Sequence, residues 1–314
     1  MKSSRTYRLI RPADALLPAA LLLSTALGRD AAAFDFFFAW MLVRLCSLAT
    51  ATGLRAAFAA QPSMRYAQGS VCAALLTQIV GAAVALPIFS SCKPHALPMV
   101  AGGLLINIEH IFYEYMYAEG DGNSASLSRA ITAALTLTGL LLSGPSGWNM
   151  GDLAQYQPVY PLVTSAISAL VALAIGLSMG GRLRPKLNPG VLKAAPMAML
   201  QTALYPALAI LLIITAFIDL PVHTFLPLWS GLILYELCRT PFRRTPAEAR
   251  PLNRALLIVC GACVIGLIPF VAGFQFPGDS PLLNDIPYCF GALLLATACA
   301  LILYSNIQKR NEYE

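Results

Sequence analysis

The chain has 314 residues, of which 58% are hydrophobic and 11% are charged, and its formal net charge is +6. Soluble domains carry about 25% charged residues, so a chain this poor in charge cannot cover a water-facing surface of this size. The composition therefore excludes a soluble globular protein for most of the chain and indicates an integral membrane protein.

Apolar segments long enough to cross a bilayer recur along the whole chain. A membrane helix needs about 20 apolar residues, and its backbone polar groups must be satisfied within the segment. We therefore expect an all-α, polytopic membrane protein with about ten transmembrane helices. The predicted spans are about 13–28, 33–54, 70–90, 98–118, 129–146, 159–180, 194–218, 221–238, 254–274 and 286–306.

Basic residues are distributed unevenly between the two predicted sides of the membrane. With the N-terminus in the cytoplasm, only Arg29 and Lys93 of the 21 Lys and Arg residues fall in outer segments, and only Arg44 falls inside a span. Short cytoplasmic loops are enriched in Lys and Arg. This pattern predicts that both termini are cytoplasmic, in a bacterial cytoplasmic membrane. Because the positive charge is dispersed over short loops, it indicates topology and not a nucleic-acid partner.

A basic inner linker divides the predicted spans into two groups. Residues 1–195 are expected to form an N-terminal six-helix membrane bundle with this linker, and residues 196–314 a C-terminal four-helix segment of the same membrane unit. The first segment also fits a signal peptide, because basic residues precede its apolar centre and small residues follow it. Cleavage there would leave nine spans in the same orientation.

The cysteines and histidines give little support for a metal or redox centre. Seven of the eight cysteines lie in or beside apolar runs, and Cys260 and Cys263 form a CxxC at helical spacing without a second CxxC. With three histidines in the chain, packing is the expected role of these residues. We predict no cofactor. The chain also has no phosphate-binding P-loop, so any energy coupling is expected to be ionic.

The stretch NIEHIFYEYMY, residues 107–117, places polar groups at the centre of the fourth predicted span. At about 100° per residue, Asn107, His110 and Glu114 share one helix face, which Tyr113 extends. Glu109 lies about 100° away from His110. We therefore expect one polar face near the bilayer midplane, with a second carboxylate on its flank.

These groups are expensive in a membrane and allow two interpretations. An ionisable residue at the midplane costs about 2.5–3.5 kcal/mol or more, and it usually faces a cavity or a partner. One interpretation is a static network that joins helices. The other is a substrate or proton site, because a carboxylate in a low dielectric accepts a proton more readily and histidine titrates near neutral pH.

Further polar residues extend the predicted site. Arg44 lies at the centre of the second predicted span and needs a counter-charge, for which Glu109 is the partner at matching depth and Glu114 the second choice. Alternatively, Arg44 contacts an anionic substrate. Gln201 and Tyr205, beside a proline in the seventh span, form a further predicted polar patch.

Four motifs resemble a known transporter superfamily. They are ALGRDAAAF, GLRAAF, EYMYAEGDGNSASLSRAI and GRLRPKLNPGVLKAAPMAML, of which the last runs five residues beyond residue 195. This region resembles one half of the multidrug/oligosaccharidyl-lipid/polysaccharide flippase superfamily, whose members have twelve or more spans. Ten spans with both termini inside also resemble the topology of the drug/metabolite transporter superfamily, with its two inverted five-span halves.

These observations favour a secondary transporter, or a flippase for lipid-linked substrates, that moves a polar or anionic substrate through a midplane cavity. The expected partners are the lipid bilayer, a small-molecule or lipid-linked substrate, and a coupling proton or cation. We do not expect an enzyme. Two alternatives remain: an intramembrane transferase with Glu109, His110 or Glu114 as general base, and a non-catalytic subunit that scaffolds a membrane complex.

Overall fold

The regular elements of the described chain are all helices. The computed structural model describes residues 12–47, 64–118, 121–143, 159–178 and 300. The predicted second half, with Gln201 and Tyr205, lies outside these residues. The helices are α1 (Pro12–Ala26), α2 (Asp30–Cys46), α4 (Met64–Cys92), α5 (Ala96–Ala118), α6 (Gly122–Ser143) and α7 (Tyr160–Ser178).

Four of these helices are long and apolar enough to cross a membrane. They contain the candidate spans Val71–Cys92, Ala96–Tyr117, Gly122–Ser143 and Tyr160–Ser178. Three of them agree closely with predicted spans and Gly122–Ser143 overlaps a fourth, so the described residues are all-helical and compatible with an integral membrane protein. α1, the shorter apolar helix at the start, packs against α6 and α2.

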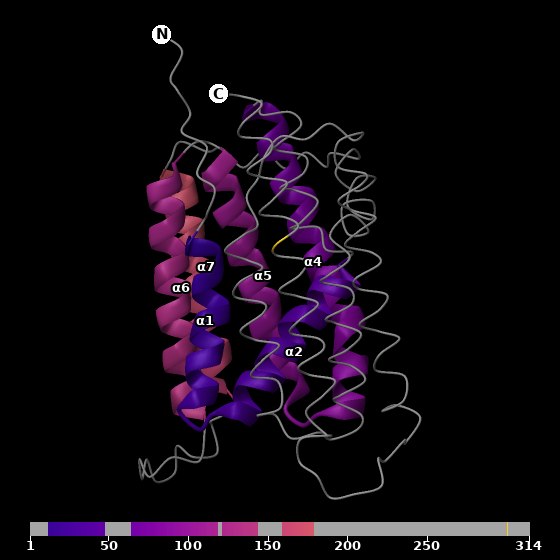
Figure 1. The fold of residues 1–314 in the computed structure, drawn as a ribbon. Helices are drawn as coiled ribbons and strands as arrows, with labels where there is room; N and C mark the ends of the chain where they lie inside the picture. The colour runs from indigo at the N-terminus through magenta and orange to yellow at the C-terminus, as the bar shows by residue number, and fades with distance from the viewer. Residues whose placement is uncertain (1–11, 48–63, 119–120, 144–158, 179–299, 301–314) are drawn as a thin grey trace, which may run out of the picture.

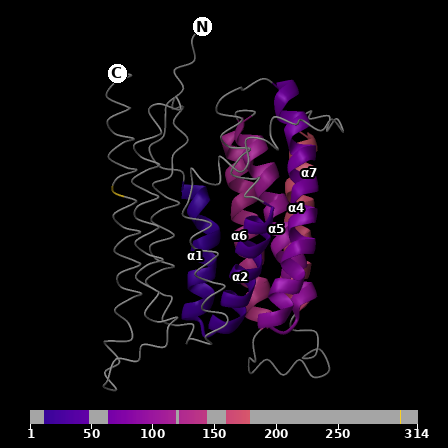
Figure 2. The same ribbon diagram turned by 90° about the vertical axis from the view of Figure 1, so that its right-hand side faces the viewer.

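Helix α5 lies at the centre of the described bundle. It packs against α2, α4, α6 and α7, while α6 also packs against α1 and α7. Figure 1 shows α1, α6 and α7 side by side, with α5 between this group and α4. Figure 2 shows the same bundle from the side of α4. Side chains on α5 are therefore surrounded by other helices.

The described helices expose large apolar side chains on their outer faces, and they bury polar side chains beside an apolar core. In the membrane the outer face meets acyl chains, so it has no need of charge, and small or polar residues let helices approach closely. The exposed large apolar residues include Leu76, Ile79, Val80 and Val84 on α4 and Val163, Ile167, Leu170 and Leu177 on α7. The buried polar residues include Gln78, Ser128, Thr132, Thr136, Ser165 and Ser168.

Glycine permits the closest contact between α5 and α2. A Cβ at Gly103 would lie 2.8 Å from the backbone nitrogen of Trp40, so a larger residue would push the helices apart. One turn further along α5, the indole Nε1 of Trp40 donates a hydrogen bond to Asn107 Oδ1 at 2.9 Å, and Asn107 Nδ2 donates to the Trp40 carbonyl at 3.3 Å. The close approach thus allows a two-way polar contact that fixes the depth of α5 against α2.

Helix α6 begins seven residues before the predicted start at 129. Asp121 caps it: its carboxylate accepts hydrogen bonds from the Ser124 backbone N–H at 3.0 Å and from the Ser124 hydroxyl at 2.6 Å. A side-chain acceptor at this position satisfies a backbone donor that the helix itself leaves open. Gly122, Asn123 and Ser124 therefore form the first turn of a helix. This correction moves Arg129 from the membrane edge into the candidate span.

A matched pair of adjacent glycines tests the α2–α5 contact. A Cβ at Gly102 would lie 3.2 Å from the ring edge of Phe36, whereas a Cβ at Gly103 meets backbone. Alanine increases helix propensity equally at both positions, so overpacking decides the difference. We expect Gly103→Ala to destabilise the protein by about 1–3 kcal/mol relative to Gly102→Ala. Thermal unfolding in detergent measures this, and equal stabilities would contradict the contact.

The cap of α6 predicts a pH-dependent stability. The hydrogen bonds from the Ser124 side chain and backbone lower the pKa of the Asp121 carboxyl. The stabilisation by the ionised cap is therefore fully present above the ordinary Asp pKa and is lost as pH falls through the lowered folded value. Asn caps comparably but does not titrate.

The melting temperature of the wild type should thus exceed that of Asp121→Asn near neutral pH, and the gap should close in acid. Asp121→Ala should be less stable than Asp121→Asn. A gap between wild type and Asp121→Asn that stays constant from neutral to acidic pH would show that the carboxylate does not cap the helix.

Candidate functional site

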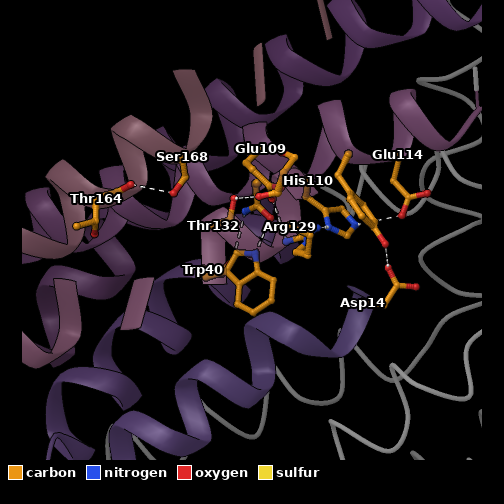
Figure 3. Close-up of polar contacts among 12 residues, drawn as sticks. Asp14, Trp40, Glu109, His110, Glu114, Arg129, Thr132, Thr164 and Ser168 are labelled. Atoms are coloured by element: carbon orange, nitrogen blue, oxygen red, sulfur yellow. Dashed lines mark hydrogen bonds and ion pairs between the residues drawn. The ribbon is translucent and has the colours of Figure 1, made fainter. Parts of the chain in front are cut away.

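The polar residues of α5 are buried inside the bundle and face two different neighbours. Asn107, Glu109, His110 and Glu114 are all buried, with at most 5% of each residue exposed. Asn107 contacts Trp40 of α2, as described above, whereas Glu109 and His110 contact Arg129 of α6, and Glu114 lies near His110 (Figure 3). The candidate span Ala96–Tyr117, which is defined by length and composition, is centred close to Asn107. Glu109 and His110 lie within about one turn of it.

An ion pair joins α5 to α6. Arg129 Nη1 lies 2.9 Å from Glu109 Oε2, and both side chains are nearly inaccessible to solvent. The hydroxyl groups of Ser128 and Thr132 on α6 border the same carboxylate. Removing both charges from water is expensive, and close contact with hydrogen-bonding neighbours is what makes such a pair tolerable.

Arg129 also contacts His110, so that one side chain connects two residues that point in different directions on α5. Arg129 Nη2 lies within hydrogen-bond distance of His110 Nδ1. The other ring nitrogen, Nε2, lies 3.7 Å from Glu114 Oε1. The result is a buried cluster of Glu109, Arg129, His110 and Glu114, which we call the charge cluster (Figure 3).

Two tyrosines extend the charge cluster toward α1 and the start of α6. The guanidinium carbon of Arg129 lies 4.4 Å from the centre of the Tyr113 ring, a cation–π contact. The Tyr113 hydroxyl donates a hydrogen bond of 2.6 Å to Asp14 Oδ1, in the first turn of α1. The Tyr113 ring packs edge-on against Tyr117, at 5.1 Å between centroids. A continuous row of polar contacts therefore runs from the centre of α5 to the N-terminal end of α1.

Within the described part of the chain, one nitrogen of the Arg129 guanidinium has no hydrogen-bond partner. Arg129 Nε is buried and unsatisfied, although the other two nitrogens of the guanidinium contact Glu109 and His110. Outside the charge cluster, the amide of Gln78 on α4 is also buried with neither of its polar atoms paired. Buried polar atoms normally find partners, and exceptions require an explanation such as a ligand or a functional role.

Arg44 occupies a different position from the one expected. α2 ends at Cys46, eight residues before the predicted end of its span, so Arg44 is buried in the last helical turn instead of at the helix centre. Glu109 forms its ion pair with Arg129, in place of the Arg44 partner that the sequence favoured. The reason is the early start of α6, which brings Arg129 about 10 Å into the helix, to the depth of Glu109.

The sequence interpretation missed Arg129, Asp14 and Trp40 as partners of the α5 residues. A usable signal existed only for Arg129, because Asp121 followed by Gly-Asn-Ser is typical of a helix N-terminus. Trp40 and Asp14 could not be found this way, since both contacts depend on how separate helices pack. Gln201 and Tyr205 lie outside the described residues and stay predictions.

No family model, curated protein or solved structure matches this chain. Among the described residues, no group of three or more His, Cys, Asp or Glu side chains could hold a metal ion.

The ion pair predicts a strong coupling between two substitutions. Glu109→Gln or Arg129→Met alone leaves a buried charge without its counter-charge, which costs about 3–5 kcal/mol. The double variant removes both charges, so we expect it to be more stable than the sum of the single effects allows. Unfolding in detergent measures all three variants.

The pair between Lys93 and Asp35 provides the control. It has a longer N–O distance, 3.6 Å, and about a fifth of each side chain is exposed. Asp35→Asn should therefore change stability by no more than about 1 kcal/mol. Additive effects of Glu109→Gln and Arg129→Met would show that the two side chains do not interact.

Proposed function

We propose that this protein is a secondary transporter, or a flippase for lipid-linked substrates, that moves a polar or anionic substrate with ion or proton coupling. The proposal includes ten spans, both termini in the cytoplasm and a bacterial cytoplasmic membrane. Its transport class agrees with the resemblance of residues 1–195 to the flippase superfamily. The observation that carries it is the charge cluster, buried near the centre of α5 between helices that are able to span a membrane.

The cost of the charge cluster argues for a role beyond holding helices together. Each charge within a membrane costs about 2.5–3.5 kcal/mol or more. Apolar side chains of similar size often stabilise a protein as well as a buried ion pair does, or better. The cluster also combines a permanent charge with groups that can exchange a proton, His110 and Glu114. This combination suits a site that binds and releases a ligand.

Each residue of the charge cluster has a distinct role in the proposed transporter. Arg129 contacts the anionic part of the substrate, the role first expected of Arg44. Glu109 compensates the guanidinium when no substrate is bound, and it is the group that holds Arg129 in place. His110 and Glu114 accept and release the coupling proton. Asp14 and Tyr113 connect this site to the end of the bundle where α1 begins.

One observation favours a second candidate, the scaffold subunit. Asn107 and Trp40 satisfy each other in both directions, which is what a permanent contact between helices requires. A scaffold needs only such fixed contacts. It therefore predicts that variants of the charge cluster alter stability and assembly, without any effect on the movement of a solute.

Flux through reconstituted vesicles distinguishes these candidates. Purified protein in phosphatidylcholine vesicles that contain a pH-sensitive dye is exposed to a panel of organic anions, with a labelled lipid-linked saccharide as a separate arm. We expect saturable movement of at least one compound, accompanied by a change in internal pH. Arg129→Gln should lower the rate by about tenfold or more, because it removes hydrogen bonds made by a charged group.

Asp35→Asn is the matched control, since Asp35 pairs with Lys93 in a contact separate from the charge cluster. It should transport like the wild type. Vesicles with wild-type protein that match protein-free vesicles for every compound and for the saccharide would contradict the transporter and favour the scaffold.

A further inference from the structure

The contact between Arg129 and His110 fixes which nitrogen of the imidazole carries a proton. All the polar hydrogens of a guanidinium are donors, and it has no acceptor. His110 Nδ1, which faces Arg129 Nη2, must therefore be unprotonated and accept the bond. A neutral imidazole then carries its proton on Nε2, the nitrogen that faces Glu114.

Protonation of His110 is incompatible with this contact. An imidazolium has N–H groups at both ring nitrogens, so Nδ1–H would oppose the Nη2–H of a second cation. The Nε2–H, in contrast, gains attraction to Glu114 when the ring becomes charged. Taking up a proton therefore breaks the bond from Arg129 and leaves Nη2 without an acceptor.

Several titratable groups of the described residues lie around His110. They include Glu109, Tyr113 and Glu114 on α5, Arg129 on α6 and, through Tyr113, Asp14 on α1. The described part of α7 and the span Val71–Cys92 of α4 contain no Asp, Glu, Lys, Arg or His. On α2, Asp35 pairs with Lys93, and Arg44 lies in the last turn.

The freed nitrogen completes a binding edge on Arg129. Nε and Nη2 lie on the same edge of the guanidinium, and their N–H groups point in parallel, which is the geometry that binds two oxygens of a carboxylate or phosphate. Nε is already buried without a hydrogen-bond partner. Nη1 stays with Glu109 on the opposite edge.

We propose, as an extension of the proposed function, that the charge cluster binds an anionic oxygen group on the Nε–Nη2 edge of Arg129 together with one proton on His110. The two ligands enter as a neutral pair. The total charge inside the bundle is thus the same before and after binding, which avoids the cost of adding an uncompensated charge to a low-dielectric site. The ligand is a carboxylate, phosphate or sulfonate, either on a free solute or in a lipid headgroup.

Calorimetric titration with benzenesulfonate tests this linkage. The charge of this probe does not change between about pH 5 and pH 8, the range in which histidine titrates, so any pH dependence belongs to the protein. The wild type in neutral detergent should bind it more tightly as pH falls, by at most about tenfold per pH unit. Titrations in buffers of different ionisation enthalpy should give an uptake of about one proton per anion at the upper end of this range.

Two substitutions of His110 mimic its protonated and unprotonated states, because one cannot accept the hydrogen bond from Arg129 and the other always can. His110→Phe removes the acceptor, so benzenesulfonate should bind with an affinity that does not depend on pH. His110→Gln keeps an acceptor for Arg129 and cannot take a proton, so binding should be weak at every pH. Arg129→Gln should not bind the probe, whereas Asp35→Asn should match the wild type. Thermal unfolding of each variant establishes that it is folded.

A second arm separates the two sources of the ligand. The titration is repeated in phosphatidylcholine vesicles with and without a minor fraction of phosphatidylglycerol. If the natural ligand is a lipid headgroup, phosphatidylglycerol should compete with benzenesulfonate, and the competition should need Arg129. If it is a free anion, the lipid should have no effect.

Several results would overturn the proposal: no binding to the wild type in either arm, an affinity that is constant or falls as pH decreases, or a wild-type pH dependence in His110→Phe. If one of these results is obtained and the vesicle assay still shows flux, only the coupling between anion binding and proton binding is rejected. Loss of flux for every compound rejects the transporter itself.

Discussion

The ion pair between Arg129 and Glu109 is the contact that organises the described bundle. It holds two neighbouring helices at a fixed depth, and it places a guanidinium where His110 and Tyr113 can also contact it. In a low dielectric such a pair cannot be separated cheaply, so anything that changes the bonds of Arg129 must offer a replacement. The chemistry of the charge cluster follows from this constraint.

The outer and inner surfaces of the helices explain how the charge cluster is sheltered. α4 and α7 expose large apolar side chains, while hydroxyl groups and glycine lie between the helices. At Gly139 a Cβ would collide with the Thr164 side chain of α7, whereas at Gly103 it would collide with the backbone of α2. Small residues thus let the helices close around the polar groups of α5, beside an apolar core that includes Phe36, Phe38 and Met41.

Composition and apolar length were sufficient to predict an all-helical protein and the positions of α4, α5 and α7, because membrane spans depend on local sequence. Helical spacing groups Asn107 with His110 on one face of α5, but Asn107 contacts Trp40 of α2 whereas His110 contacts Arg129 of α6. The residues that contact this part of α5 from other helices could not be predicted in this way. Arg129 was assigned to the membrane edge because hydropathy alone places the start of α6 too late, and the cap at Asp121 corrects it. Asp14 and Trp40 contact α5 from helices that are distant in sequence, so spacing contains no information about them.

The protonation state of His110 tests the account most directly. In nitrogen-15 NMR of histidine-labelled protein, only three histidines contribute signals, and the His110 signal is the one lost in His110→Gln. Near neutral pH, without added anions, the account predicts an unprotonated Nδ1 and a protonated Nε2. A protonated Nδ1, in either the neutral ring or the imidazolium, would show that Arg129 does not donate to His110 and would contradict the arrangement of the charge cluster.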